Sequence, residues 1–102
     1  MFCVVYEFKI KAGQAHEFER SWADFTEAIY RVCGSLGSRL HKTTDPLIYV
    51  AYAQWPSKEI FERKIPQESY RPEEWSQREV MTKTLENSKK VYELEVHDDH
   101  LR

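Results

Sequence analysis

An alternating segment followed directly by an amphipathic one constrains the fold of this chain more than any other feature. In Phe2–Ile10 every second residue is large and apolar, which predicts a β-strand with one face on a core. From Gln14 to Cys33 apolar residues recur every three or four positions, which predicts an α-helix with one apolar stripe. Gly34 follows directly and suits the left-handed backbone that often ends a helix.

The remaining chain continues the same alternation of strands and helices. The predicted elements are strands at Leu36–Thr43 and Leu47–Trp55, a short helix capped by Ser57 and ending at Lys64, a helix at Pro72–Ser88, and a strand at Lys90–His97. The Asp45-Pro46 pair marks the turn between the two central strands. The order β-α-β-β-α-β predicts an α+β, ferredoxin-like fold, a four-stranded antiparallel sheet with helices on one face. At 102 residues, we expect residues 1–102 to form a single domain.

Charge and cysteine content limit the classes of partner. The formal net charge is −2 and no basic run occurs, so we expect no nucleic-acid partner. No apolar window approaches the ~20 residues of a membrane span, and no membrane partner is expected. Glu7 and Lys9 interrupt the apolar N-terminus, and no secretory signal is predicted. Cys3 and Cys33 lie far apart and outside any C-x-x-C pattern, which favours free thiols and a cytoplasmic location.

Apolar residues occupy both faces of the predicted sheet, although helices can cover only one. The face opposite the helices would carry Cys3, Val5, Leu36, Leu40, Ile48, Val50 and Tyr52. Soluble monomers rarely expose a contiguous patch of this kind. A second copy packed face to face is the simplest cover, and we predict a homodimer. The alternative is that some of these residues are tolerated on an exposed strand edge.

The central hairpin combines small, titratable and aromatic residues. If His41 pairs with Tyr49, one face of the hairpin carries Gly37, Arg39, His41, Tyr49, Ala51, Ala53 and Trp55, and a slip of one residue would move half of them across the sheet. The small residues would leave a hole under the helices. This composition is typical of a small-molecule pocket, mostly apolar with a few polar groups.

Each pocket candidate has a functional and a structural interpretation. His41 could act as general base toward a phenolic proton, beside Arg39 as an anion-binding group. Otherwise His41 is satisfied by a backbone carbonyl or solvent, and Arg39 is a solvated or interface charge. Tyr6 and Tyr49 are candidate donors. Trp55 would form a flat wall or cover the core, and Trp22 would fill core or roof the cavity.

The run "GSLGSRLHKTTDPLIYVAYAQWPSKEIFE", with "KAGQAHEFERSW" before it, resembles the antibiotic-biosynthesis monooxygenase family of the dimeric α+β barrel superfamily. The matching positions are Gly34, Leu40-His41, Asp45-Pro46, Trp55 and Phe61. The resemblance implies oxygen insertion into small phenolic, quinol or anthrone-type substrates by O2, without flavin, haem or metal as cofactor. The substrate loses a proton, and the resulting anion passes an electron to O2.

Carried over by position, the resemblance implies that His41 and Trp55 belong to the substrate site. Ala51 stands where a characterised enzyme of this kind has a substrate-binding asparagine, and Phe61 stands where it has a tyrosine. The haem-degrading branch requires a first-strand asparagine, where this chain has Tyr6, and a histidine in the later helix, which is absent. We therefore do not expect haem degradation.

The C-terminal run "EVHDDHLR" suggests a metal site, but no further ligand spacing supports one, and no metal is expected. Three functions remain open. The first is a cofactor-independent monooxygenase, with His41 as catalytic residue and Arg39, Trp55, Tyr6, Tyr49, Ala51, Phe61 and Trp22 binding an aromatic substrate. The second is a small-molecule-binding or stress-response barrel without turnover. The third is a cofactor-free isomerase acting on a lactone or ketone.

Overall fold

The structure, a computed structural model, describes residues 1–102 without gaps. Its elements are β1 (Phe2–Ile10), α1 (Ala15–Cys33), β2 (Gly37–Lys42), β3 (Ile48–Trp55), α2 (Lys58–Glu62), the 3-10 turn η1 (Gln67–Ser69), α3 (Pro72–Thr84) and β4 (Leu85–Glu95). The strands form one antiparallel sheet in the order β2-β3-β1-β4. The ferredoxin-like fold predicted from the sequence is confirmed.

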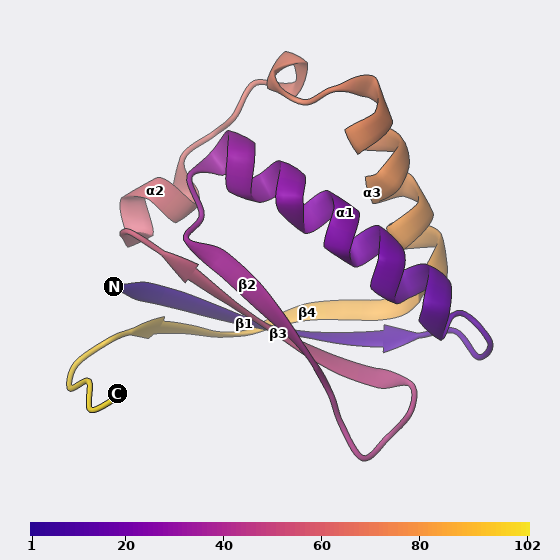
Figure 1. The fold of residues 1–102 in the computed structure, drawn as a ribbon, viewed down its shortest axis with the longest axis horizontal. Helices are drawn as coiled ribbons and strands as arrows, with labels where there is room; N and C mark the ends of the chain where they lie inside the picture. The colour runs from indigo at the N-terminus through magenta and orange to yellow at the C-terminus, as the bar shows by residue number, and fades with distance from the viewer.

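Figure 1 shows the layers: α1 and α3 lie on one side of the sheet, and no helix covers the other side. The apolar stripe of α1 packs Phe18 onto Phe8 of β1 and Tyr49 of β3, with ring centroids 5.3 and 4.9 Å apart. A second cluster, Phe2, Val4, Ala53 and Trp55, lies toward α2. None of the helices combines the length and the apolar character that spanning a bilayer requires.

The helix boundaries follow the local signals in the sequence. Gly34 ends α1 with φ of 81°, a conformation that costs glycine little. The Ser57 side chain accepts a hydrogen bond from the Ile60 backbone N–H and caps α2. Pro72 is the first residue of α3.

The last strand begins earlier than predicted. We expected α3 to continue to Ser88 and a strand over Lys90–His97, but α3 ends at Thr84 and β4 starts at Leu85. The physical reason is pairing with β1, since Leu85 lies opposite Ile10 and the Lys11 backbone N–H donates to the Thr84 carbonyl at 2.8 Å. Leu85 therefore packs on the core from a strand instead of from a helix.

The predicted register of the hairpin is wrong by one residue. His41 pairs with Val50, not Tyr49, and Leu40 pairs with Ala51. Directly paired residues share a face, so Leu40 points toward the helices, whereas Arg39 and His41 point to the face without helices. We call this second surface the open face. Leu40 therefore does not belong to the open face, and the prediction that it does is wrong.

Candidate functional site

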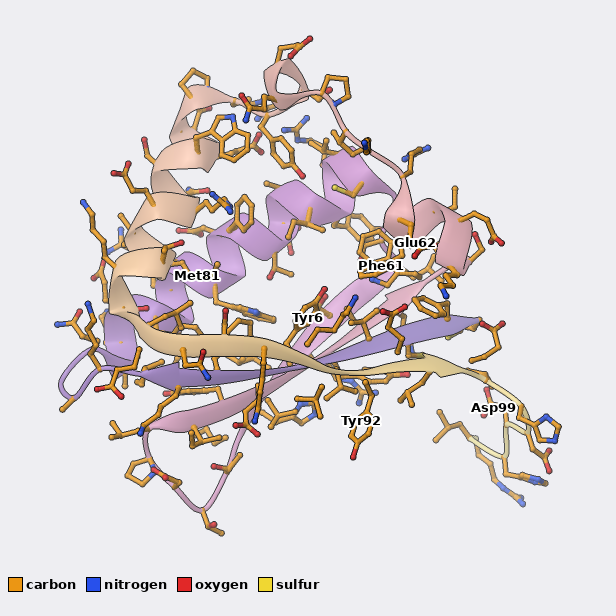
Figure 2. All side chains as sticks on the ribbon, turned by 180° about the vertical axis from the view of Figure 1, so that it is seen from behind. Tyr6, Phe61, Glu62, Met81, Tyr92 and Asp99 are labelled. Carbon is orange, nitrogen blue, oxygen red and sulfur yellow. The ribbon has the colours of Figure 1, made fainter.

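A cavity of about 400 Å³ lies between the sheet and the helices. Its walls are the side chains of Tyr6, Phe8, Trp22, Phe25, Thr26, Ile29, Ser38, Ala51, Ala53, Trp55, Arg78, Met81 and Ser88. We call it the aromatic cavity. Its size and its mostly apolar lining match those of small-molecule sites in general. Figure 2 shows Tyr6 and Met81 on the side of the sheet that carries the helices, and Tyr92 on the opposite side.

The hollow exists because small residues occupy the centre of the sheet. Ala51 and Ala53 lie on β3 beneath α1, where larger side chains would fill the space. Trp22 and Phe25 are one helical turn apart on α1 and form the opposite wall. The result is a slot between aromatic rings, which suits a flat ligand.

Trp55 lines this slot and carries an unsatisfied donor. Its side chain is only 6% exposed, and its indole Nε1–H is the one buried side-chain polar group without a hydrogen-bond partner. Leaving a buried donor unpaired costs on the order of 1–3 kcal/mol. An acceptor that reached this N–H would remove that cost, so Trp55 is the lining residue with a hydrogen bond left to make.

Tyr6 adds a second donor. Burial raises the pKa of its phenol, and the nearby Lys90 opposes that rise. The hydroxyl is therefore protonated at neutral pH and can donate a hydrogen bond. Three small hydroxyl groups, those of Thr26, Ser38 and Ser88, also line the cavity.

Arg78 supplies the only formal charge in the lining. It extends from α3, and its side chain forms neither an ion pair nor a hydrogen bond within the chain. The guanidinium carbon lies 5.7 Å from the centre of the Trp75 ring. The cavity thus offers donors and one cation, and no carboxylate, which favours a ligand with electron-rich or anionic oxygen.

Four of the predicted site residues line the aromatic cavity: Tyr6, Trp22, Ala51 and Trp55. The prediction that His41 and Arg39 face it is wrong, because the register places both on the open face. There the His41 Nδ1 lies 3.1 Å from the Val50 carbonyl, and the Arg39 guanidinium lies 5.5 Å from the Tyr52 ring centre. Both side chains follow the structural alternatives considered above.

Tyr49 and Phe61 lie on the helix side of the sheet but outside the cavity lining. Tyr49 is buried, and its hydroxyl donates to the Glu19 carboxylate. Phe61 packs on Phe2 and Trp55, with ring centroids 5.6 and 5.2 Å away. Phe61 therefore helps to hold the Trp55 ring in place.

Sequence reasoning missed several lining residues, including Phe8, Ser38 and Met81. Phe25 lies one turn after Trp22, so the helical stripe contained a signal for it. Ser38 follows from the corrected register. Arg78 belongs to the predicted helix whose entry loop could gate access, and the structure places it in the lining itself.

Another hollow, of about 340 Å³, lies beside the β2–β3 turn. Its lining is mainly polar and includes Glu19, Lys42, Thr43 and Asp45. Its one buried tyrosine, Tyr49, already has a partner in Glu19. The aromatic cavity, whose lining includes the residue with the unpartnered donor, is therefore the candidate site.

The fold is shared with several solved structures. SnoaB, a cofactor-independent oxygenase from Streptomyces nogalater, superposes with a TM-score of 0.73 at 17% identity, covering 99% of this chain and 97% of that one. A protein from Bordetella bronchiseptica gives 0.74 at 16% identity, covering 94% and 97%. Rv0793 from Mycobacterium tuberculosis gives 0.70 at 12% identity, covering 98% of each chain. At these identities the likeness shows the fold alone.

Sequence comparison identifies the family. A search of curated proteins found no match. The family model described as antibiotic biosynthesis monooxygenase matches residues 1–63, which is more than half of the 102-residue chain and includes β1, α1, β2 and β3. These elements supply most of the cavity lining. The chain therefore belongs to the antibiotic biosynthesis monooxygenase family.

Proposed function

We propose that the chain is a cofactor-independent monooxygenase that uses O2 to oxidise a small phenol, quinol or anthrone-like aromatic in the aromatic cavity. The observation that carries the proposal is that Trp55, whose buried indole N–H has no partner, lines a cavity between aromatic walls. Membership of the family and the likeness to SnoaB support it.

The proposed role of the protein is to stabilise the anion of the substrate. Trp55 donates its N–H to the substrate oxygen, and Arg78 places a positive charge beside it. Both interactions favour the ionised form and lower the pKa of the bound substrate. Because no imidazole or carboxylate lines the cavity, the proton passes to water.

The oxidation requires no reactant other than the substrate and O2. The substrate anion transfers one electron to O2, and its carbon then bonds to one oxygen atom of the superoxide formed. The peroxide takes up a proton, its O–O bond breaks, and the same carbon loses its remaining hydrogen as a proton. The carbon becomes a carbonyl, and the second oxygen atom leaves as water. In sum, a CH2 group, which a phenol or quinol has in its keto form, and O2 give a C=O group and H2O.

The experiment measures O2 uptake with a panel of naphthohydroquinones and anthrones, comparing the wild type with Trp55→Phe and His41→Ala. Trp55→Phe keeps an aromatic ring but removes the donor, and we expect kcat to fall roughly tenfold or more. His41→Ala should retain the wild-type rate, because His41 lies outside the cavity. Equal rates in all three proteins would contradict the role of Trp55. A fall in kcat in His41→Ala alone would indicate that the imidazole is the catalyst.

One observation favours a second function, ligand binding without turnover. No side chain that titrates near neutral pH lines the cavity, so the protein lacks an internal base there. In that case aromatic anions would raise the melting temperature, and O2 uptake would stay at the uncatalysed rate. The same panel therefore separates the two functions.

A second copy of the chain is the proposed cover for the open face. Tyr92 and Leu94 of β4 are 60% and 41% exposed there, opposite Val5 and Cys3 of β1. They extend the apolar surface formed by Val50 and Tyr52 beyond what the sequence predicted. Both cysteines are free, which agrees with the cytoplasmic location that we propose.

A further inference from the structure

Arg78 reaches the aromatic cavity as an unpaired cation, and the structure shows how it stays unpaired. Glu74, one turn earlier on α3, accepts from the Arg31 side chain and from the Arg71 backbone N–H. Glu79, the residue that follows Arg78, pairs with Lys83, with the Lys83 Nζ 3.8 Å from the carboxylate. Glu74 and Glu79, the nearest carboxylates to Arg78 along α3, therefore have other partners.

The guanidinium lies over the ring of Trp75, three residues earlier and on the same side of α3. Stacking on an indole ring attracts a guanidinium without neutralising it. An ion pair would hold Arg78 as well, but it would compete with an anionic ligand. The Trp75 contact leaves all the guanidinium N–H groups available.

The Trp75 ring is itself held in place from two sides. Its Nε1–H donates to the Gln67 carbonyl of the 3-10 turn, at 3.3 Å. The Tyr70 ring lies against it with centroids 5.0 Å apart, and Tyr70 in turn stacks on Phe25 of the cavity wall at 6.1 Å. The Tyr70 hydroxyl is 3.0 Å from the Cys33 sulfur at the end of α1. The Trp75 ring of α3 is thus held to the 3-10 turn and, through Tyr70, to α1.

We propose that Trp75 is a positioning residue that holds the Arg78 guanidinium at the aromatic cavity, where it selects aromatic ligands with an ionised oxygen. The inference rests on the proposed function only in taking the aromatic cavity as the ligand site. It adds the charge of the ligand as the property that is recognised, and it assigns a role to a residue outside the cavity lining.

The test is a double-mutant cycle with two probes of the same shape, 2-naphthoate, which is anionic, and 2-naphthamide, which is neutral. Dissociation constants are measured for the wild type, Trp75→Ala, Arg78→Gln and the double variant. We expect Arg78→Gln to weaken 2-naphthoate about tenfold or more, and Trp75→Ala to weaken it about fivefold. Binding of 2-naphthamide should stay within about twofold in each variant, because a neutral probe makes no charge-assisted contact.

Two comparisons separate positioning from general damage. In the Arg78→Gln background Trp75→Ala should have no further effect on 2-naphthoate, and Trp75→Phe should retain near wild-type binding because it keeps an aromatic face. Arg20→Gln, which removes an exposed arginine of α1, should leave both probes unaffected. Equal losses for both probes in Trp75→Ala, or the same loss with and without Arg78, would overturn the inference.

A measurement without ligand keeps the two proposals distinguishable. The NMR order parameter of the Arg78 side-chain Nε–H should fall in Trp75→Ala and persist in Trp75→Phe, and an unchanged value in Trp75→Ala would overturn the positioning role. If the wild type binds 2-naphthoate through Arg78 but consumes no O2 with any substrate, the oxygenase proposal fails and this inference stands. If it binds neither probe, the cavity is not an aromatic site and both fail.

Discussion

Tyr49 shows how a single residue can be close to a site without belonging to it. Its ring packs on Phe18, and its hydroxyl donates to Glu19 at the start of α1. Burial, and then the hydrogen bond to Glu19, raise the pKa of the phenol to about 12. Tyr49 therefore stays neutral at physiological pH and joins α1 to β3 through its hydrogen bond to Glu19.

This pKa predicts an alkaline limit to stability. The unfolded chain has a tyrosine pKa of about 10. Because the folded-state pKa is higher, the contribution of Tyr49 to the free energy of unfolding is complete below pH ~10 and is lost as the pH rises toward about 12. Urea unfolding across this range should show a decline that is smaller in Tyr49→Phe by about 2 kcal/mol.

Tyr30→Phe provides the control, since Tyr30 is 54% exposed on α1. It should retain the wild-type decline. A Tyr49→Phe profile that falls as steeply as the wild type would show that another group causes the loss.

At the scale of elements, the end of α1 at Gly34 sets where β2 begins. A Cβ at Gly34 would meet the Ile60 side chain at 3.5 Å, an ordinary contact, so space does not exclude a larger residue. The backbone does, because φ is 81°. We predict that Gly34→Ala lowers the free energy of unfolding by about 1–2 kcal/mol. Asparagine tolerates this conformation better, so Gly34→Asn should lose less in the same urea titration. Equal losses would point to the Ile60 contact instead.

The elements themselves were predictable from the sequence, because their signals are local. Alternation in Phe2–Ile10 and the stripe of α1 each depend on a single periodicity. The start of β4 was not predictable in this way. It depends on pairing with β1 at Ile10, a contact between segments distant in the sequence.

The hairpin register was also beyond local reasoning, and it decides the site. Thr43 donates its hydroxyl to the Ile48 carbonyl at 2.9 Å, and the Asp45 carboxylate accepts from the Leu47 backbone N–H at 2.9 Å. These bonds fix a turn one residue longer than the predicted register requires. A shift of one residue moves a side chain to the other face of the sheet. His41 and Arg39 therefore lie outside the cavity, whereas Ala51 and Trp55 line it as predicted.

At the scale of the whole molecule, the open face predicts self-association. Burying its exposed apolar side chains would stabilise a dimer by roughly 1.5–3 kcal/mol for each large residue fully covered. We expect sedimentation velocity to show a dimer at micromolar concentration. The double variant Tyr92→Glu, Leu94→Glu should sediment as a monomer, because two charges would be buried at the interface.

Val80→Glu is the matched control, because Val80 is a 36% exposed apolar residue of α3 on the other side of the molecule. It should remain dimeric. A wild-type protein that sediments as a single subunit at this concentration would contradict a face-to-face dimer.

The central claim is that the Trp55 indole N–H receives the oxygen of an aromatic ligand. The chain has three tryptophans, so three indole N–H signals are expected in the 1H-15N NMR spectrum, and Trp55→Phe identifies the one of interest. Titration with 2-naphthoate should move the Trp55 signal downfield and slow its exchange with water, because the N–H gains an acceptor. If the ligand binds and the Trp55 signal does not change, the oxygen lies elsewhere and the proposed site is wrong.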